Sequence, residues 1–196
     1  LQDVLADPKN KQIMILAHNK NLLTYLYKAI EHRNIATVGY YIGGMKQKDL
    51  KESENKKVII ATYAMAEEAL DIKTLSTLIM ATPKTDVTQA VGRILRIKHE
   101  QPLVIDIVDL HSTFKNQFKK RQTFYKKNKY KVIHTDSYTY ESKKANDAEW
   151  ETLVDVSKSG TKKPCKANNK ANNKANSNNV IDINETDMPG ICLIDI

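Results

Sequence analysis

Cysteine is scarce in this chain, and long hydrophobic runs are absent from it. Cys165 and Cys192 are the only cysteines among the 196 residues. Two thiols cannot complete a tetrahedral zinc site, and no histidine lies near either of them in the sequence, so we expect no metal centre. No apolar run approaches the roughly 20 residues that a membrane-spanning helix needs, and no signal peptide begins the chain. We therefore expect no membrane association, unpaired thiols, and a reducing, cytoplasmic location.

Two sequence elements used by nucleotide-hydrolysing enzymes are absent as well. No segment has the G-x-x-x-x-G-K-[ST] spacing that cradles phosphates, since neither Gly43–Gly44 nor the stretch 160–162 has the required pattern. No D-E-x-H or D-E-A-D run is present to hold magnesium. We expect that this chain by itself does not hydrolyse a nucleoside triphosphate.

Positive charge is concentrated in one part of the chain. The formal net charge is +8, and residues 1–140 carry about +9 because residues 141–196 are nearly balanced. The stretch His111–Lys131 contains eight basic residues and no acidic one. Such a run is either a solvated helix face or a surface for a polyanion, because each neutralised phosphate releases counterions. Lys119 and Lys120 are therefore candidate nucleic-acid contacts.

Apolar blocks alternate with amphipathic stretches over the first 140 residues. Short, mostly apolar runs suit strands that are buried on both faces of a parallel sheet. The predicted strands are Gln12–Ala17, Ile35–Ile42, Lys57–Thr62, Leu75–Ala81 and Pro102–Asp109, with a last edge strand at Lys131–Asp136. The predicted helices are one capped by Asn19 or Asn21, then Lys46–Asn55, Tyr63–Leu70, Asp86–Arg96 and His111–Asn128. Right-handed crossovers between such strands predict an α/β fold with helices on both faces of the sheet.

The composition changes after about Ser142. Residues 166–179 repeat Lys, Ala and Asn in fours, and such a segment buries too little to offset its ordering entropy. We therefore expect residues 1–140 to form the domain and 141–196 a polar, mostly disordered tail, whose deletion leaves the thermal midpoint nearly unchanged. The final apolar stretch, Gly190–Ile196, is the exception: it is either solvated tail or a strand that pairs with another segment.

The clearest chemical signal is the octet Gln89–Arg96, which reads Q-A-V-G-R-I-L-R. Arg93 and Arg96 are three residues apart on a predicted helix, so they share one face, and Gln89 lies one turn earlier. Gly92 removes a side chain beside Arg93 and lets that face approach another surface. Two guanidinium groups directed to one place fit a phosphate or a carboxylate, because the planar fork binds oxyanions through two hydrogen bonds. A solvated helix face is the alternative interpretation.

The octet resembles motif VI of superfamily 2 helicases. Ile59–Ile72 is similar to their motif V, Ile13–Asn19 resembles motif IV, and Tyr40–Met45 resembles a short element that follows it. The resemblance covers about residues 10–110, and among superfamily 2 proteins it is nearest to helicases of large cytoplasmic DNA viruses, such as the poxvirus transcript-release helicase. It implies a RecA-like second lobe, the use of ATP and Mg²⁺, and a viral replication site or virion as the location.

The resemblance also implies roles for single residues. Arg93 and Arg96 would act as arginine fingers on the γ-phosphate, and Gln89 would link that phosphate to the nucleic-acid side. On the nucleotide side the resemblance also places Glu68, Asp71 and Gly92. Taken alone, Asp71 is more typical of the polar end of a helix, and its register with the motif is what favours the nucleotide role. The nucleic-acid contacts would be Thr62, Asn19, Gly43 and Gly44. The family usually has Gly where Ala69 stands, which puts a close backbone contact there in doubt.

Two functions follow from these residues. The first is the C-terminal motor lobe of an ATP-dependent helicase, acting on DNA in preference to RNA and supplying arginine fingers. Such a lobe needs an N-terminal RecA-like lobe, in cis or in trans, that holds most of the Mg²⁺ site. Because the chain begins with Leu1 in sequence that already reads as folded domain, we expect a fragment or a processed product. The alternative is a non-catalytic module that binds nucleic acid or protein.

Overall fold

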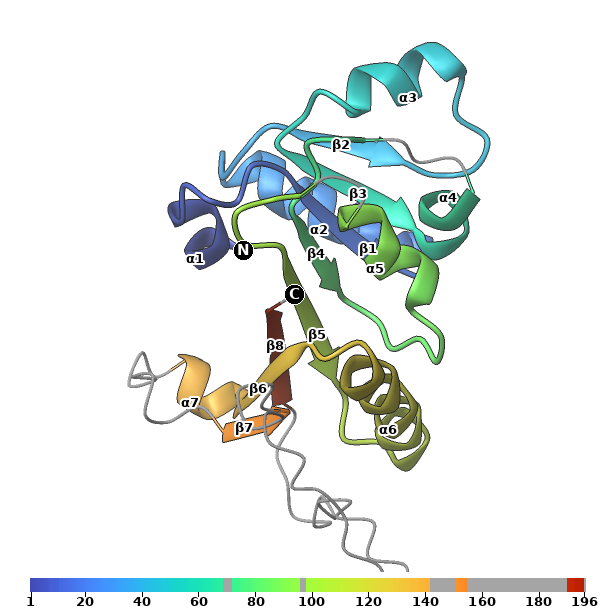
Figure 1. Cartoon of the computed structure of the whole chain (residues 1–196). Helices are drawn as coiled ribbons and strands as arrows, with labels where there is room; N and C mark the ends of the chain where they lie inside the picture. The colour runs from blue at the N-terminus through green and yellow to red at the C-terminus, as the bar shows by residue number, and fades with distance from the viewer. Residues whose placement is uncertain (69–71, 96–97, 142–150, 155–189, 196) are drawn as a thin grey trace, which may run out of the picture.

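A computed structural model describes residues 1–68, 72–95, 98–141, 151–154 and 190–195 of the chain (Figure 1). Helices and strands alternate along most of its length. In chain order they are α1 Gln2–Ala6, β1 Ile13–Ala17, α2 Lys20–His32, β2 Val38–Tyr41, α3 Gln47–Ser53, β3 Val58–Thr62, α4 Tyr63–Glu68, β4 Thr77–Met80, α5 Thr88–Ile94, β5 Leu103–Val108, α6 Ser112–Lys127, β6 Lys131–Asp136, α7 Ser137–Glu141, β7 Glu151–Val154 and β8 Gly190–Asp195.

The first five strands form the parallel part of one sheet. Their order is β2-β3-β1-β4-β5, and every neighbouring pair among them is parallel. The predicted α/β class and its parallel sheet are confirmed, and each of these five strands lies within the range predicted for it. The arrangement is that of a RecA-like lobe.

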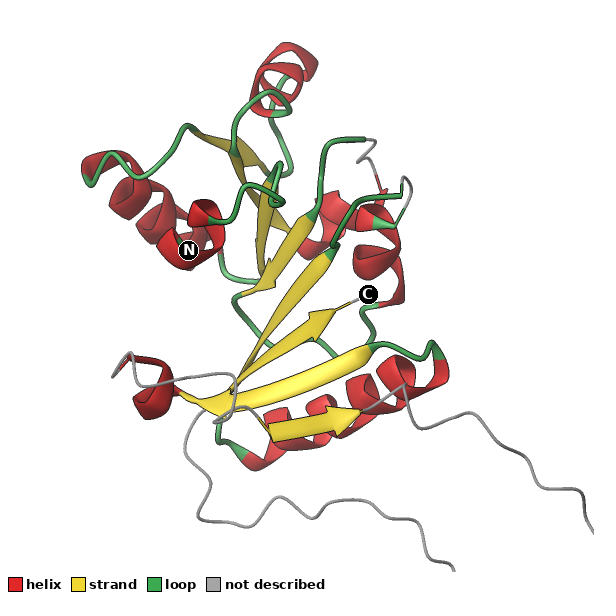
Figure 2. Ribbon diagram, turned by 60° about the vertical axis from the view of Figure 1, so that its left-hand side comes forward, coloured by secondary structure: helices red, strands yellow, loops and turns green. Residues whose placement is uncertain are grey.

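Helices cover both faces of the sheet, as Figure 2 shows. Side chains of β1 alternate between the two faces: Ile13 and Ile15 are buried with α1 and α2, whereas Met14 and Leu16 are buried with α3, α4, α5 and α6. Because both faces are covered, the strands consist almost entirely of apolar residues rather than alternating with polar ones. This is why the sequence pattern locates these strands well.

The amino ends of the strands hold a buried polar network that is satisfied within the chain. The Asn10 side chain donates to the Val4 carbonyl over 2.7 Å and accepts from the Thr77 hydroxyl over 2.7 Å. The Gln12 amide donates to the carbonyls of Glu54 and Lys56, both at 2.7 Å. Since each of these groups already has partners, this edge of the sheet stabilises the fold. The functional candidates lie elsewhere.

The last three strands extend the sheet in antiparallel fashion, in the order β8-β6-β7 beyond β5. Each of the six residues of β8 pairs with β5 on one side and with β6 on the other. The predicted strand at Lys131–Asp136 is confirmed, but its expected edge position is wrong, because β8 and β7 flank it. Of the two interpretations of Gly190–Ile196, the structure supports the paired strand.

Two short parts of the expected tail therefore belong to the sheet. β7 and β8 both come from residues beyond 140, so the end of the sheet does not coincide with the expected domain boundary. Deletion after Ser142 would remove both strands, so their pairing argues against the expectation that this deletion leaves the thermal midpoint nearly unchanged. The Lys/Asn repeat at 166–179 lies outside the described residues, and its disorder stays a prediction.

Candidate functional site

The carboxyl ends of β1, β3 and β4 meet at one edge of the sheet, where three side chains make contact. The His18 amide donates to the Thr82 hydroxyl over 3.0 Å, and the Tyr63 hydroxyl donates to the Thr82 carbonyl over 2.6 Å. The rings of His18 and Tyr63 lie 4.6 Å apart between centroids. Burial raises the pKa of Tyr63 above its ordinary value, so its hydroxyl remains a donor. These bonds fix the segment that leaves β4.

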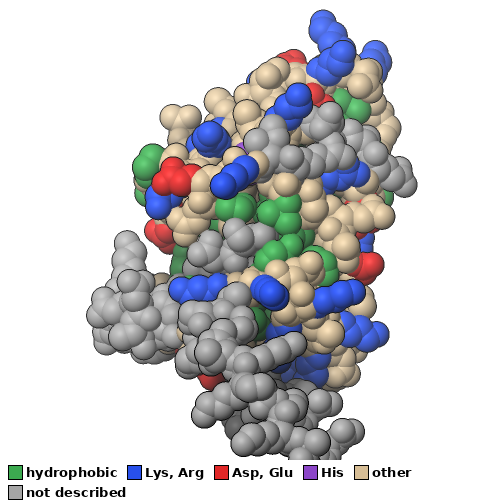
Figure 3. Space-filling view, viewed as in Figure 1, with side chains coloured by type: hydrophobic (Ala, Val, Ile, Leu, Met, Phe, Trp, Pro, Cys, Tyr) green, Lys and Arg blue, Asp and Glu red, His purple; other side chains and the backbone are tan. Residues whose placement is uncertain are grey.

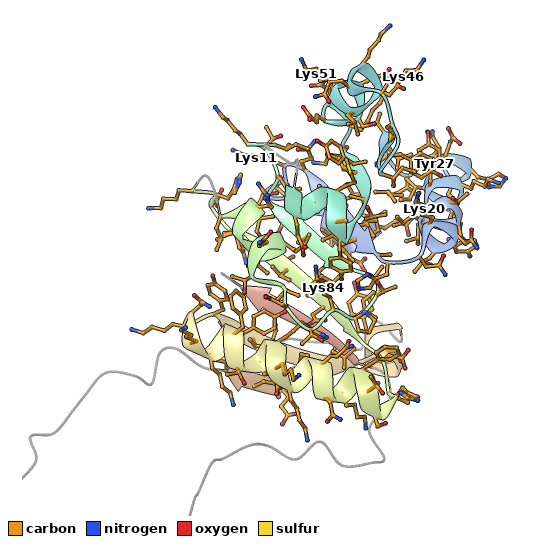
Figure 4. All side chains as sticks on the ribbon, turned by 90° about the vertical axis from the view of Figure 1, so that its right-hand side faces the viewer. Lys11, Lys20, Tyr27, Lys46, Lys51 and Lys84 are labelled. Atoms are coloured by element: carbon orange, nitrogen blue, oxygen red, sulfur yellow. The ribbon has the colours of Figure 1, made fainter. Side chains whose placement is uncertain are left out.

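Lys84 continues this cluster toward α4 and α5. Its ammonium pairs with the carboxylate of Glu67 on α4 and lies 5.0 Å from the centre of the Tyr63 ring. Both partners of the ion pair are largely buried, with 21% and 23% of their side chains exposed. Figure 4 shows Lys84 on the side of the sheet between α6 and the shorter helices. A partly buried pair of this kind is screened less by salt than a surface pair.

Helix α5 carries the predicted phosphate-binding residues. Its start is fixed by Asp86, whose carboxylate accepts from the Thr88 amide over 2.9 Å, and this hydrogen bond lowers the pKa of Asp86. Ala90, Val91 and Ile94 form its buried face. Gln89 and Gly92 are exposed, and a Cβ on Gly92 would have no atom within 4 Å. The side of α5 that bears the motif is therefore open.

Arg93 links α5 to the end of α4. Its guanidinium donates to the backbone carbonyl of Glu67, the same residue whose carboxylate pairs with Lys84. Glu67 is thus the common partner of two cations that come from different segments. Arg96 and Asp71 lie outside the described residues, and so does the side chain of Glu68 at the end of α4. Their roles stay predictions.

The predicted nucleic-acid contacts fall into two groups. Thr62, Asn19 and Gly43–Gly44 follow or end strands at the carboxyl edge of the sheet. Asn19 is the N-cap of α2, and its side chain accepts from the Asn21 amide over 2.8 Å. Gly44 has a φ of 92°, a conformation that favours glycine, so the turn after β2 depends on it.

Lys119 and Lys120 form the second group, on α6. Both side chains are exposed, whereas Phe118 and Tyr125 of the same helix are buried, as the helical spacing predicts. Helix α6 packs beside β5, at the opposite end of the parallel strand order from β2 (Figure 1). Basic side chains gather over this part of the molecule in Figure 3. The structure does not bring these two lysines together with the carboxyl-edge residues.

A buried ion pair between β5 and α6 was missed in the sequence. The carboxylate of Asp106 accepts two hydrogen bonds from Arg121, at 2.7 and 2.9 Å, and a third from the Tyr125 hydroxyl at 3.1 Å. Burial raises the pKa of Asp106, while Arg121 and Tyr125 act to lower it. The signals were present: Asp106 interrupts an apolar strand, and Arg121 shares the helix face of Phe118 and Tyr125.

The described part of the chain contains neither a membrane-spanning helix nor a cluster of metal ligands. Among those residues no helix has both the length and the apolar character that crossing a membrane requires. Within the same ranges, no three or more His, Cys, Asp or Glu side chains gather as metal ligands would.

Comparisons with known proteins agree on one family. Residues 1–98 match the model described as "Helicase conserved C-terminal domain". A "Putative ATP-dependent RNA helicase" of Acanthamoeba polyphaga mimivirus is 43% identical over 127 residues, covering 62% of this chain and 24% of that protein. A protein of the same description from African swine fever virus is 27% identical over 131 residues, covering 62% of this chain and 26% of the relative. The chain thus spans about a quarter of the length of these relatives.

A solved structure supports the fold. The C-terminal domain of the DEAD-box protein Dbp5 superimposes with a TM-score of 0.50 at 18% identity, covering 63% of this chain and 77% of that one. At this identity the likeness concerns the fold alone. It agrees with the parallel sheet and the two helical layers described above.

Proposed function

Because this chain belongs to the helicase conserved C-terminal domain family of superfamily 2, we propose that it is the second motor lobe of an ATP-dependent viral helicase. In this role it supplies arginine fingers and part of the nucleic-acid track to a site completed by an N-terminal lobe. The open side of α5, which presents Gln89 and Gly92 next to Arg93, carries the proposal.

The donor set on α5 fits a phosphate group. Arg93 offers a planar fork of N–H donors, and it now donates to the Glu67 carbonyl at the end of α4. A carbonyl oxygen has only a partial charge, so a fully charged phosphate binds the guanidinium more strongly. The open space beside Gly92 admits a partner surface to this donor. Arg96 follows one helical turn later in the sequence and would add a second fork.

ATP, when bound, supplies the phosphoryl group whose hydrolysis drives movement. In that reaction Arg93 and Arg96 stabilise the charge that develops as the phosphoryl group leaves. Gln89 links the γ-phosphate to the nucleic-acid side of the lobe. Asp71, Glu68 and Gly92 would contact the nucleotide in this role. Because no cluster of carboxylates is present among the described residues, Mg²⁺ would be held mainly by the N-terminal lobe.

The nucleic-acid track follows the carboxyl edge. Thr62 offers a hydroxyl at the start of α4, and Asn19 starts the 13-residue helix α2, whose N-terminal amides favour a phosphate. Gly43 and Gly44 let a backbone approach closely. We propose RNA as the strand, since two relatives are named RNA helicases, in place of the DNA expected from the viral resemblance.

The exposed lysines of α6 offer a second surface for phosphates. Lys119 and Lys120 project away from the buried face of this helix, in a stretch of the sequence that lacks acidic residues. Their contribution would be sequence-independent and sensitive to salt. The alternative function, a non-catalytic module that binds nucleic acid or protein, uses this surface and has no need of Arg93 and Arg96.

Substitution of the arginines tests the motor role in the protein that contains both lobes. Arg93→Lys and Arg96→Lys should each lower ATP turnover by a factor of roughly 10² or more, because Lys lacks the fork that a transition-state phosphate requires. The KM for ATP should change only about a few-fold, since fingers act mainly in the transition state. Arg33→Lys, at the exposed end of α2, is the matched control and should leave both constants unchanged.

The outcome separates the two functions. Near-normal turnover in both Arg93→Lys and Arg96→Lys would show that α5 carries no arginine finger. Nucleic-acid binding that persisted in those variants would then favour the non-catalytic module. A parallel comparison of RNA and DNA strands of one sequence decides which nucleic acid stimulates turnover.

A further inference from the structure

The guanidinium of Arg121 makes one contact that its ion pair with Asp106 does not require. Its Nε and Nη2 atoms donate to the two carboxylate oxygens of Asp106, and its Nη1 atom donates to the backbone carbonyl of Lys84 over 2.6 Å. The side chains of Arg121 and Asp106 are 0% exposed. Apolar side chains of similar volume often replace a buried ion pair without loss of stability. They cannot provide a donor for the carbonyl of Lys84.

That carbonyl belongs to the segment 81–87, which joins β4 to α5. The segment is held from three directions by contacts already described: β1 through His18, α4 through Tyr63 and Glu67, and α6 through Arg121. The first two come from the same edge of the sheet. The contact with Arg121 reaches across to the long helix packed against β5, 37 residues further along the chain.

The segment leads directly into α5. Lys84 lies four residues before the first residue of that helix, and its ammonium pairs with the side chain of Glu67, whose carbonyl accepts from Arg93. A continuous series of contacts therefore runs from Arg121 through Lys84 and Glu67 to Arg93. A shift of the Lys84 backbone would move both the start of α5 and one of the two cations that meet at Glu67.

We propose that Arg121 is a positioning residue for the phosphate-binding side of this lobe. By fixing the Lys84 carbonyl, it sets where α5 begins and where Arg93 meets the end of α4. Asp106 holds the guanidinium in the orientation that this contact needs, and the Tyr125 hydroxyl donates to Asp106 in turn. The effect on the segment stands independently of ATP, and the effect on catalysis rests on the function proposed above.

A paired substitution separates positioning from stability. Asp106→Leu combined with Arg121→Met removes both buried charges and keeps the volume of the core, so the fold should survive. The thermal midpoint should fall only by the cost of the unpaired Tyr125 hydroxyl and Lys84 carbonyl. The segment should nevertheless loosen. The amides of His18 and Thr88, whose acceptors Thr82 and Asp86 lie in this segment, report on it. We expect their hydrogen exchange to accelerate by about tenfold or more.

Two single substitutions complete the test. Tyr125→Phe removes one hydrogen bond to Asp106 and keeps all three contacts of Arg121, so exchange at His18 and Thr88 should stay normal. Arg121→Lys keeps a charge beside Asp106 but cannot reach the carboxylate and the Lys84 carbonyl together, so exchange should accelerate. In the protein with both lobes, Arg121→Lys should lower kcat by about tenfold or more, with the KM for ATP within about a few-fold.

Each result bears on the proposal. Normal exchange at His18 and Thr88 in the folded double variant would overturn it. If the double variant did not fold, while Arg121→Lys folded with normal exchange, the ion pair would be purely structural, which also overturns it. Faster exchange with unchanged turnover would support Arg121 as the residue that fixes this segment and would count against the role proposed for Arg93.

Discussion

Substitution of Gly92 is expected to have opposite effects on the stability of the fold and on ATP turnover. It lies inside α5, and a Cβ there would meet no atom within 4 Å. Gly92→Ala should therefore raise the free energy of unfolding by about 0.5–1 kcal/mol, because alanine restricts the unfolded chain and suits a helix. In the protein with both lobes the same substitution should lower ATP turnover, since the methyl group fills space beside Arg93. Thermal melts and an ATPase assay measure the two effects.

Gly39→Ala provides the contrast for that experiment. A Cβ at Gly39 would lie 2.9 Å from the Cα of Ser53, so this substitution should lower stability. If Gly92→Ala stabilised the chain and left turnover unchanged, no partner surface approaches α5 closely at that point. The proposal that this side of α5 faces the other lobe would then be wrong.

Single residues were predictable from sequence where a local pattern marks them. Gln89, Gly92 and Arg93 are recognisable by their spacing, and the structure places the first two on the open side of α5. Arg121 was missed because its neighbours in the sequence are exposed lysines, so composition groups it with them. Its burial depends on Asp106, fifteen residues away on another element. Local signals mark each of the two residues as buried, but no local pattern indicates that they pair with each other.

The strand β8 contributes to stability at the scale of elements. Deletion of residues 190–196 removes hydrogen-bonding partners from both β5 and β6 and leaves two strand edges unpaired. We expect a loss on the order of 3 kcal/mol, which corresponds to a fall of roughly 10 °C in the thermal midpoint for a domain of this size. Differential scanning calorimetry of the full and shortened chains measures it.

The Lys/Asn repeat offers the matched control. Deletion of one four-residue unit, residues 167–170, should change the midpoint by less than about 2 °C, because the cost of closing a loop varies slowly with its length. An equal effect of both deletions would mean that chain length, and not the pairing of β8, determines the stability. No effect of either deletion would contradict the position of β8 in the sheet.

The basic face of α6 makes a second prediction at this scale. Lys119→Gln with Lys120→Gln should weaken binding to nucleic acid and flatten the dependence of log K on log salt by about one unit for each phosphate contact that is lost. Lys11→Gln with Lys28→Gln removes the same charge from exposed positions on other elements. That control should lower affinity less and leave the slope nearly unchanged. An unaltered slope in the α6 variant would mean that these lysines form a solvated helix face and do not contact phosphates.

The sequence predicted where the strands lie along the chain better than it predicted which strands pair in the sheet. The five parallel strands were found because burial on both faces makes them continuous apolar runs. The position of β8 was not found, since Gly190–Asp195 pairs with residues that are remote in sequence and nothing local indicates which strand it joins. For the same reason, β6 was assigned to an edge. The pairing of strands across a long intervening segment is determined by the assembled sheet and not by the local sequence.

The whole molecule is predicted to lack activity by itself. Purified chain should show no ATPase activity stimulated by nucleic acid, because it contains no phosphate-cradling loop, and the magnesium-binding run is also absent from its sequence. Addition of an N-terminal lobe should restore turnover that depends on Arg93. Measurable turnover of the chain by itself, abolished by Arg93→Ala, would refute this division of labour between two lobes.

The position of β8 between β5 and β6 also determines the order in which the molecule can form during translation. Residues 1–108 contain all five parallel strands, so this part can assemble as soon as it leaves the ribosome. β6 emerges next, but its place in the sheet depends on a strand synthesised more than fifty residues later. Until then, β5 and β6 each present a free edge that another nascent chain can pair with. Rapid synthesis or early chaperone binding would protect this protein during the interval before β8 is synthesised.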